Sequence, residues 1–170
     1  MPVLAQYNHT YYTKLPLDEK MVTIDADSRV LDVPPQLQKC AGIENDHLAE
    51  SIMFIVDRFH DGMDLMNAEV YIQWTATEIV DGEPKKIEKT TSVPKDQMDY
   101  NFAQNKIRFP WILSSDVTKY PGTISFSAVF FMTGDVTIPD PSDASKTVTT
   151  TGVTYRYSTL PSTIKIEPAL

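Results

Sequence analysis

Hydrophobic and polar positions along the chain follow the two-residue period of β-strands. Residues 68–74 place Ala, Val, Ile and Trp at alternate positions, with Glu, Tyr and Gln between them. That period is expected when one face of a strand meets a core and the other meets water. Residues 49–57 form a nine-residue apolar run, which predicts a strand buried on both faces. With His60-Asp61-Gly62 as a turn between them, we expect these two strands to form a central β-hairpin.

Two further hairpins are predicted from turn residues. Asp25 to Ser28 separate short strand patterns at Met21–Ile24 and 29–33, and Asp and Ser side chains favour turns by bonding their own backbone. Asp81-Gly82 separates a run ending at Val80 from residues 85–93, because Gly accepts the left-handed backbone of such turns. The polar face of 85–93 predicts an edge strand whose charges discourage pairing with other chains.

The C-terminal half carries weaker signals. Residues 107–111 alternate, and Pro110 predicts an edge or a bulge since it cannot donate to a ladder. Ser114 is placed to cap one helical turn that Pro121-Gly122 ends, and 123–132 is a strong strand pattern. Residues 134–146 (GDVTIPDPSDASK) predict an exposed loop. Residues 147–157 are strand-like and Thr-rich.

These elements predict an all-β fold, an antiparallel β-sandwich. A parallel sheet would need crossover helices, which the sequence lacks. Residues 21–157 form the predicted sandwich, with Trp74 and Trp111 as core anchors. Residues 1–20 show no clean period and predict an extended N-terminal arm. Residues 158–170 predict an extended C-terminal tail.

Composition narrows the possible partners. The 170 residues carry 15 basic and 23 acidic side chains, a net charge of −8, without a Lys/Arg cluster that would bind a phosphate backbone. We therefore expect no nucleic acid. No apolar run reaches the roughly 20 residues that span a bilayer, and the first residues lack a signal-peptide pattern, so we expect no membrane and assembly in a cytoplasm. Cys40 stands alone, which excludes an intramolecular disulfide and predicts a small buried thiol.

Candidate catalytic and metal-binding residues are sparse. Asp57, His60, Asp61 and Asp64 fall within eight residues, but their spacing matches neither a zinc motif nor a calcium loop. A polar turn explains them better, and the same holds for Asp25 and Asp27. No serine sits in a Gly-x-Ser-x-Gly elbow beside His9, His47 or His60. We predict no catalytic residue, no metal and no cofactor; a hydrolase using His47 or His60 is the weakest hypothesis.

Aromatic residues leave a second function open. The rings in question are those of Tyr71, Tyr100, Phe102, Tyr155 and Tyr157. Such amphipathic rings suit either a sugar-stacking platform or packing within and between subunits. A carbohydrate-binding module on the same fold is the alternative, and it requires the rings to lie exposed on one face.

Five stretches resemble a known family. They are 25–34 (DADSRVLDVP), 42–50 (GIENDHLAE), 54–64 (FIVDRFHDGMD), 109–130 (FPWILSSDVTKYPGTISFSAVF) and 155–166 (YRYSTLPSTIKI). Together they resemble the β-sandwich docking domain in structural proteins of tailed phages and prophages of Gram-positive bacteria, including the N-terminal domain of upper baseplate proteins. The resemblance spans residues 21–166 and contains no catalytic residue.

The resemblance implies a non-enzymatic structural protein of the virion. Members of that family attach a module to the particle and often work as symmetric oligomers. Here the domain comes without a coiled coil or receptor-binding head, so we expect an attachment or decoration unit that binds the capsid or the tail and baseplate surface. The implied partners are other phage structural proteins and further copies of this chain, with residues 1–20, 158–170 and edge strands making the contacts.

Overall fold

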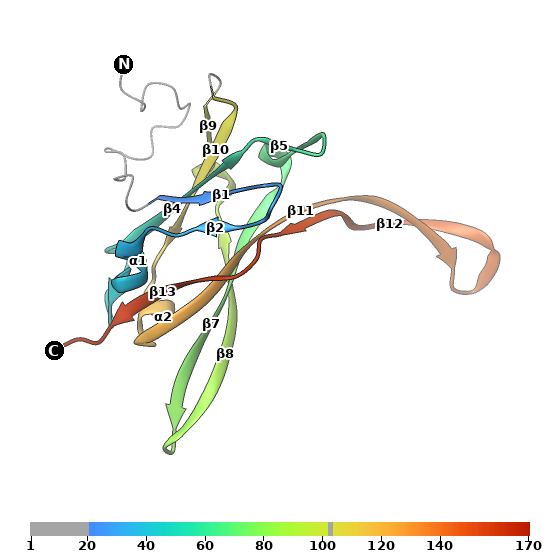
Figure 1. Cartoon of the computed structure of the whole chain (residues 1–170). Helices are drawn as coiled ribbons and strands as arrows, with labels where there is room; N and C mark the ends of the chain where they lie inside the picture. The colour runs from blue at the N-terminus through green and yellow to red at the C-terminus, as the bar shows by residue number, and fades with distance from the viewer. Residues whose placement is uncertain (1–20, 102–103) are drawn as a thin grey trace.

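The computed structural model describes residues 21–101 and 104–170 and has two facing β-sheets (Figure 1). The predicted arm at residues 1–20 lies outside the described residues. The first sheet has the strand order β2-β1-β4-β10-β9, and the second has the order β3-β13-β11-β7-β8 with β12 also paired to β11. The prediction of an all-β sandwich is confirmed. Most neighbouring strands are antiparallel, but β1 with β4 and β13 with β3 are parallel.

The element bounds follow the chain order. The strands of the first sheet are β1 (Met21–Ile24), β2 (Leu31–Asp32), β4 (Ser51–Asp57), β9 (Asp99–Asn101) and β10 (Lys106–Ile112). Those of the second are β3 (Gly42–Ile43), β7 (Glu69–Val80), β8 (Glu83–Val93), β11 (Gly122–Asp140), β12 (Asp143–Ser158) and β13 (Ser162–Glu167). A two-stranded sheet, β5 (Phe59–His60) with β6 (Met63–Asp64), and the short helices α1 (Pro35–Lys39), η3 (Leu65–Asn67), η4 (Lys95–Gln97) and α2 (Ser115–Thr118) lie between them.

Aromatic side chains join the two sheets. Phe54 on β4 stacks on Phe109 of β10, with ring centroids 5.2 Å apart, and meets the edge of Phe126 on β11 at 5.9 Å. Trp111 contacts the same Phe126 ring from β10 at 5.4 Å. Trp111 and Trp74 are both buried, as predicted for the core anchors.

Local turn and capping predictions are confirmed. The Asp25 carboxylate accepts hydrogen bonds from the amides of Asp27 and Ser28, and this turn joins β1 to β2. Asp81 and Gly82 have φ values of 53° and 78° in the turn between β7 and β8. The Ser114 hydroxyl accepts from the Asp116 amide at the start of α2.

Pro110 lies in the part of β10 that does not pair with β9. β9 pairs only with Lys106, Ile107 and Arg108, so among the described strands the half of β10 that contains Pro110 is an edge, as predicted. β8 also ends its sheet, which confirms the predicted edge strand.

The predicted central hairpin is wrong. β4 and β7 lie in opposite sheets: β4 pairs with β1 and β10, whereas β7 pairs with β11 and β8. The segment between them contains a tight turn at Asp61-Gly62, which joins β5 to β6. It then crosses from the first sheet to the second through η3. A strand inside a sheet pairs with one neighbour along each edge, and neither neighbour has to be the next strand along the chain.

Two segments expected to lie outside regular structure belong to the second sheet. The predicted loop at 134–146 is wrong: β11 continues to Asp140 and returns as β12, forming one long hairpin. The predicted tail at 158–170 is extended, but its central part is β13, which pairs with β11 and buries Ile164 and Ile166. The sandwich therefore continues to Glu167.

Candidate functional site

The described residues hold no cluster typical of a metal centre. No group of three or more His, Cys, Asp or Glu side chains comes together within 21–101 and 104–170 in a way that could hold a metal ion. Asp64 instead binds Arg58 through two hydrogen bonds of 2.9 and 2.8 Å and accepts a third from the Met66 amide. The Arg58 hydrogen bond is the main reason that the pKa of Asp64 is lowered. This carboxylate shapes the turn before η3.

The two histidines of the described chain lie at opposite ends of β4. His47, before the strand, accepts a hydrogen bond from the Ser115 amide through Nδ1. His60, after it, packs its ring against Tyr157 with centroids 4.7 Å apart. Its ring nitrogens lie 3.9 Å from Asp27 and 3.6 Å from Asp61. Among the described residues no hydrogen bond joins either histidine ring to a serine hydroxyl.

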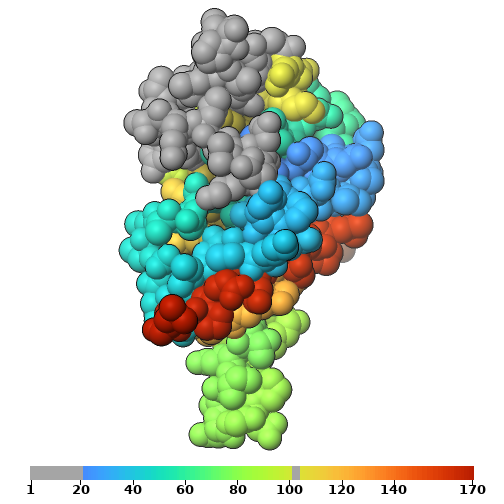
Figure 2. Space-filling model, turned by 60° about the vertical axis from the view of Figure 1, so that its left-hand side comes forward, coloured from blue at the N-terminus to red at the C-terminus, as the bar shows by residue number. Residues whose placement is uncertain are grey.

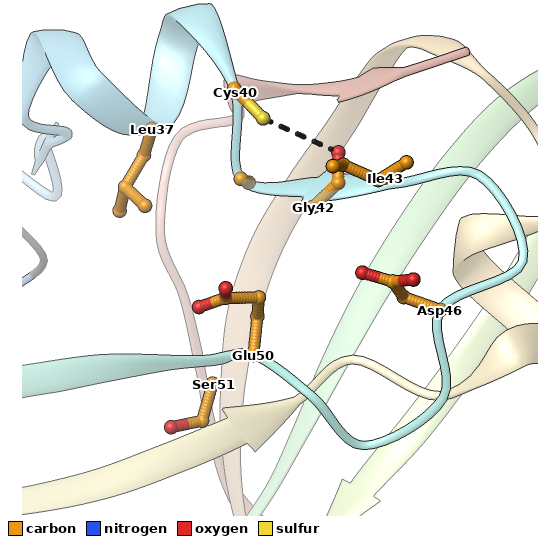
Figure 3. A pocket seen from close by; sticks show the side chains of 8 residues that line it. Leu37, Cys40, Gly42, Ile43, Asp46, Glu50 and Ser51 are labelled. Carbon is orange, nitrogen blue, oxygen red and sulfur yellow. Dashed lines mark hydrogen bonds between the residues drawn. The ribbon is translucent and has the colours of Figure 1, made fainter. Parts of the chain in front are cut away.

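A small hollow of about 100 Å³ lies between α1, β3 and the start of β4 (Figure 3). Asp46 and Glu50 line it from different parts of one loop, together with Cys40. The thiol donates to the Gly42 carbonyl at 3.5 Å, but the residue is exposed, so the prediction of a buried thiol is wrong. The helix α1 ends at Lys39, and Cys40 is the residue that follows it, on the surface of the protein.

The aromatic side chains do not form one platform. Tyr157 is buried in the core, and Tyr155 is half-buried beside it. Tyr71 packs against Phe131 at 5.6 Å, while Tyr100 lies under the Arg58 guanidinium at 5.0 Å on the other sheet. Phe102 lies outside the described residues. These rings therefore serve several separate contacts.

The most prominent surface features are two β-hairpins that leave the sandwich (Figure 1). The β7–β8 hairpin projects beyond the body of the molecule, as its green tip shows in Figure 2. At this tip Ile79 is 66% exposed and Val80 42%. Its outer strand, β8, carries Lys85, Lys86 and Lys89, and along its eleven residues no strand of the described chain pairs with its outer edge.

The β11–β12 hairpin projects further, in another direction (Figure 1). We call residues 133–139 paired with 147–153 the ribbon. β7 and β13 pair with β11 only up to Phe131, so both outer edges of the ribbon have no neighbouring strand within the described chain. Its one aspartate, Asp135, and each of its threonines are exposed, and so are Ile138 and Val148.

The two faces of the ribbon differ. Paired residues share a face, and one face carries Val136 opposite Thr150 and Ile138 opposite Val148. The same face begins at Gly134 opposite Gly152 and continues from Phe130 and Met132, whose side chains pack in or against the core. The opposite face carries Asp135, Thr137, Thr149 and Thr151. The face of the ribbon that carries Val136 and Ile138 therefore continues the core-facing side of the second sheet, at a point where the first sheet no longer lies opposite it.

Sequence reasoning missed this ribbon. Asp135-Val136-Thr137-Ile138 does alternate, and Val148 and Thr149 continue the pattern on the return strand. Pro139, Pro141 and the surrounding Asp and Ser residues gave a stronger turn signal over a segment that is mostly strand.

Comparisons with known proteins add no family to this picture. No protein-family model matches the chain, and no curated protein matches it. Among the described residues no helix has the length and apolar character needed to cross a membrane.

Proposed function

We propose that this chain is a non-enzymatic structural protein of a phage particle, an attachment or decoration unit on the capsid or on the tail and baseplate. The observation that carries the proposal is the pair of projecting hairpins. Exposed apolar side chains such as Ile79 and Val153, 66% and 58% exposed, combined with free strand edges, are typical of surfaces that bind other proteins. That the particle is a phage is inferred from the resemblance to phage docking domains.

The sandwich acts as a rigid support in this proposal. One aromatic core joins both sheets, so each hairpin starts from a fixed base. Two arms that engage a repetitive surface together gain avidity through effective concentration without new contacts in either arm. Such a unit needs no bound cofactor, and we propose that it assembles onto the particle in the host cytoplasm.

Cryo-electron microscopy of the native particle tests the proposal. We expect density for the sandwich in symmetry-related copies. Copies spread over the head would make the chain a capsid decoration protein, and copies confined to the tail tip would make it a baseplate component. Particles that lack the chain altogether would overturn the proposal, and binding of the isolated chain on a glycan array would then favour the carbohydrate-binding alternative.

Shortened variants separate the contributions of the segments. Replacing residues 134–152 by a two-residue Asn-Gly turn removes the ribbon and leaves every core side chain in place. We expect this variant to fold and to enter particles poorly. Removal of residues 1–20, which lie outside the described residues, is the parallel variant for the predicted arm. Normal incorporation of both folded variants would contradict attachment through projecting segments.

A further inference from the structure

We propose that the ribbon of one copy adds as an extra strand pair to the free edge of β8 in a second copy, so that the second sheet continues from molecule to molecule. The inference concerns contacts between copies of this chain. It stands whether or not the chain belongs to a phage particle.

The first argument is the incomplete state of the ribbon. A two-stranded antiparallel sheet is marginally stable by itself in water and gains stability from a third strand or a packed face. The ribbon consists of seven residue pairs, about 24 Å at the usual strand rise, and the described residues give it neither a third strand nor a fully packed face. Val136, Ile138 and Val148 share one face that no described element covers fully, since both strands are largely exposed there.

The second argument is the edge of β8. Its eleven residues pair on one side with β7, and on the other side no strand of residues 21–101 and 104–170 pairs with them. Long unprotected edges are templates for strand addition. Ile87 lies on the core-facing side of β8 between Lys85 and Lys89, and it is half-buried. A strand added here would place its own apolar side chains beside Ile87.

Charge decides which surfaces meet. Residues 133–154 contain three aspartates and one lysine, a net charge of −2, whereas β8 contains three lysines and two glutamates, a net charge of +1 in a chain of −8. Lys86 pairs with Glu88 at 2.8 Å, but Lys85 and Lys89 form no ion pair with any described residue. Two ribbons would repel one another, and so would two β8 edges. The contact between ribbon and β8 is the attractive combination.

The arrangement in space requires two molecules. The ribbon and the β7–β8 hairpin leave the sandwich in different directions (Figure 1), so a ribbon does not lie along β8 of its own chain. Different surfaces meet in such a contact, and a heterologous contact of this kind repeats from copy to copy. It produces a closed ring if the rotation closes and a filament if it does not.

Charge reversal tests the pairing in the purified full chain. We expect sedimentation velocity to show self-association that weakens as salt is raised. Asp135→Lys on the ribbon with Asp140→Lys at the turn that ends it reverses the net charge of residues 133–154, and Lys85→Glu with Lys89→Glu reverses that of β8. Each pair of substitutions should weaken association about tenfold, and all four together should restore it. The control is Asp32→Lys with Asp96→Lys, which changes the net charge of exposed sandwich residues as the ribbon variant does and should leave association unchanged.

Several outcomes would overturn the inference. They are a wild-type chain that stays monomeric at every concentration, a reversed pair no weaker than the control, and a four-fold variant that is folded by circular dichroism but does not associate. Amide hydrogen exchange of the wild-type chain is a second test, and it needs no substitution. Raising the protein concentration should slow exchange in one strand of the ribbon, 133–139 or 147–153, and in β8; protection elsewhere but not there would contradict the contact.

Discussion

Tyr157 connects distant parts of the chain through one buried side chain. Its hydroxyl donates to the Ala26 carbonyl at 2.6 Å, and its ring meets His60 and Phe130 edge-on. The Arg29 guanidinium lies 4.5 Å above the same ring and also donates to the Ser158 carbonyl. This residue therefore ties the β1–β2 turn to the base of the β11–β12 hairpin.

We expect Tyr157→Phe to lower the free energy of unfolding by about 1–3 kcal/mol, because it leaves the Ala26 carbonyl without its donor. Urea denaturation measures the change. Tyr155→Phe is the matched control, since the Tyr155 hydroxyl is buried and has no hydrogen-bond partner among the residues that the structure describes. Its removal should cost little. Equal losses in both variants would contradict the role given to the Tyr157 hydroxyl.

At the scale of elements, β13 is a structural strand. It pairs with β11 along five residues and with β3 at its end. The Ala41 amide also donates to the Lys165 carbonyl, which fixes the end of α1 against this strand. The extended pattern of Ile164 and Ile166 was visible in the sequence, but pairing and burial are what make the strand part of the sandwich.

Truncation of one isoleucine measures that burial. Ile164→Ala and Ile166→Ala should each cost about 2–5 kcal/mol, the range for a fully buried side chain. Leu160→Ala, at a residue that is 52% exposed two positions before β13, should change the free energy of unfolding by less than about 1 kcal/mol. Small and equal effects of all three in urea denaturation would mean that β13 is detached in solution.

At the scale of the whole molecule, the response to acid combines two opposing effects. Acidification from neutral pH toward the isoelectric point of about 4.8 removes net negative charge and with it mutual repulsion. Hydrogen bonds from the amides of Ser28 and Asp27 lower the pKa of Asp25, and the Arg58 hydrogen bond lowers that of Asp64. A lowered folded-state pKa stabilises fully above the unfolded value, 3.8 for Asp, and this stabilisation is lost as pH falls through the folded value.

Asp64→Asn isolates the second effect. At neutral pH we expect this variant to be less stable than the wild type by about 1–3 kcal/mol, because the charged hydrogen bonds to Arg58 are weakened. The difference should shrink as pH drops below 3.8, while the change in overall repulsion is nearly the same in both proteins and cancels. Urea midpoints at a series of pH values provide the comparison. A difference that grows in acid would have the wrong sign for a carboxylate with a lowered pKa.

The sequence by itself determined the turns, one helix cap and the clearest strands. The Asx turn at Asp25, the left-handed turn at Asp81-Gly82 and the cap at Ser114 each depend on contacts within a few residues, so their side chains identify them. The two-residue period likewise identified β7 and the first part of β11, and with them the all-β class. Burial of Trp74 and Trp111 followed from size and hydrophobicity alone.

Only the tertiary structure decided which strands pair and which surface remains free. β4 pairs with β1 and β10 instead of β7. β13 pairs with the first part of β11, although the whole of β12 lies between the two strands in the sequence. The candidate interaction surface was not predictable for the same reason, since the ribbon is the part of the β11–β12 hairpin that no other described strand pairs with. Period and turn chemistry act over a few residues, whereas these strand partners are more than thirty positions apart, a separation that no local pattern encodes.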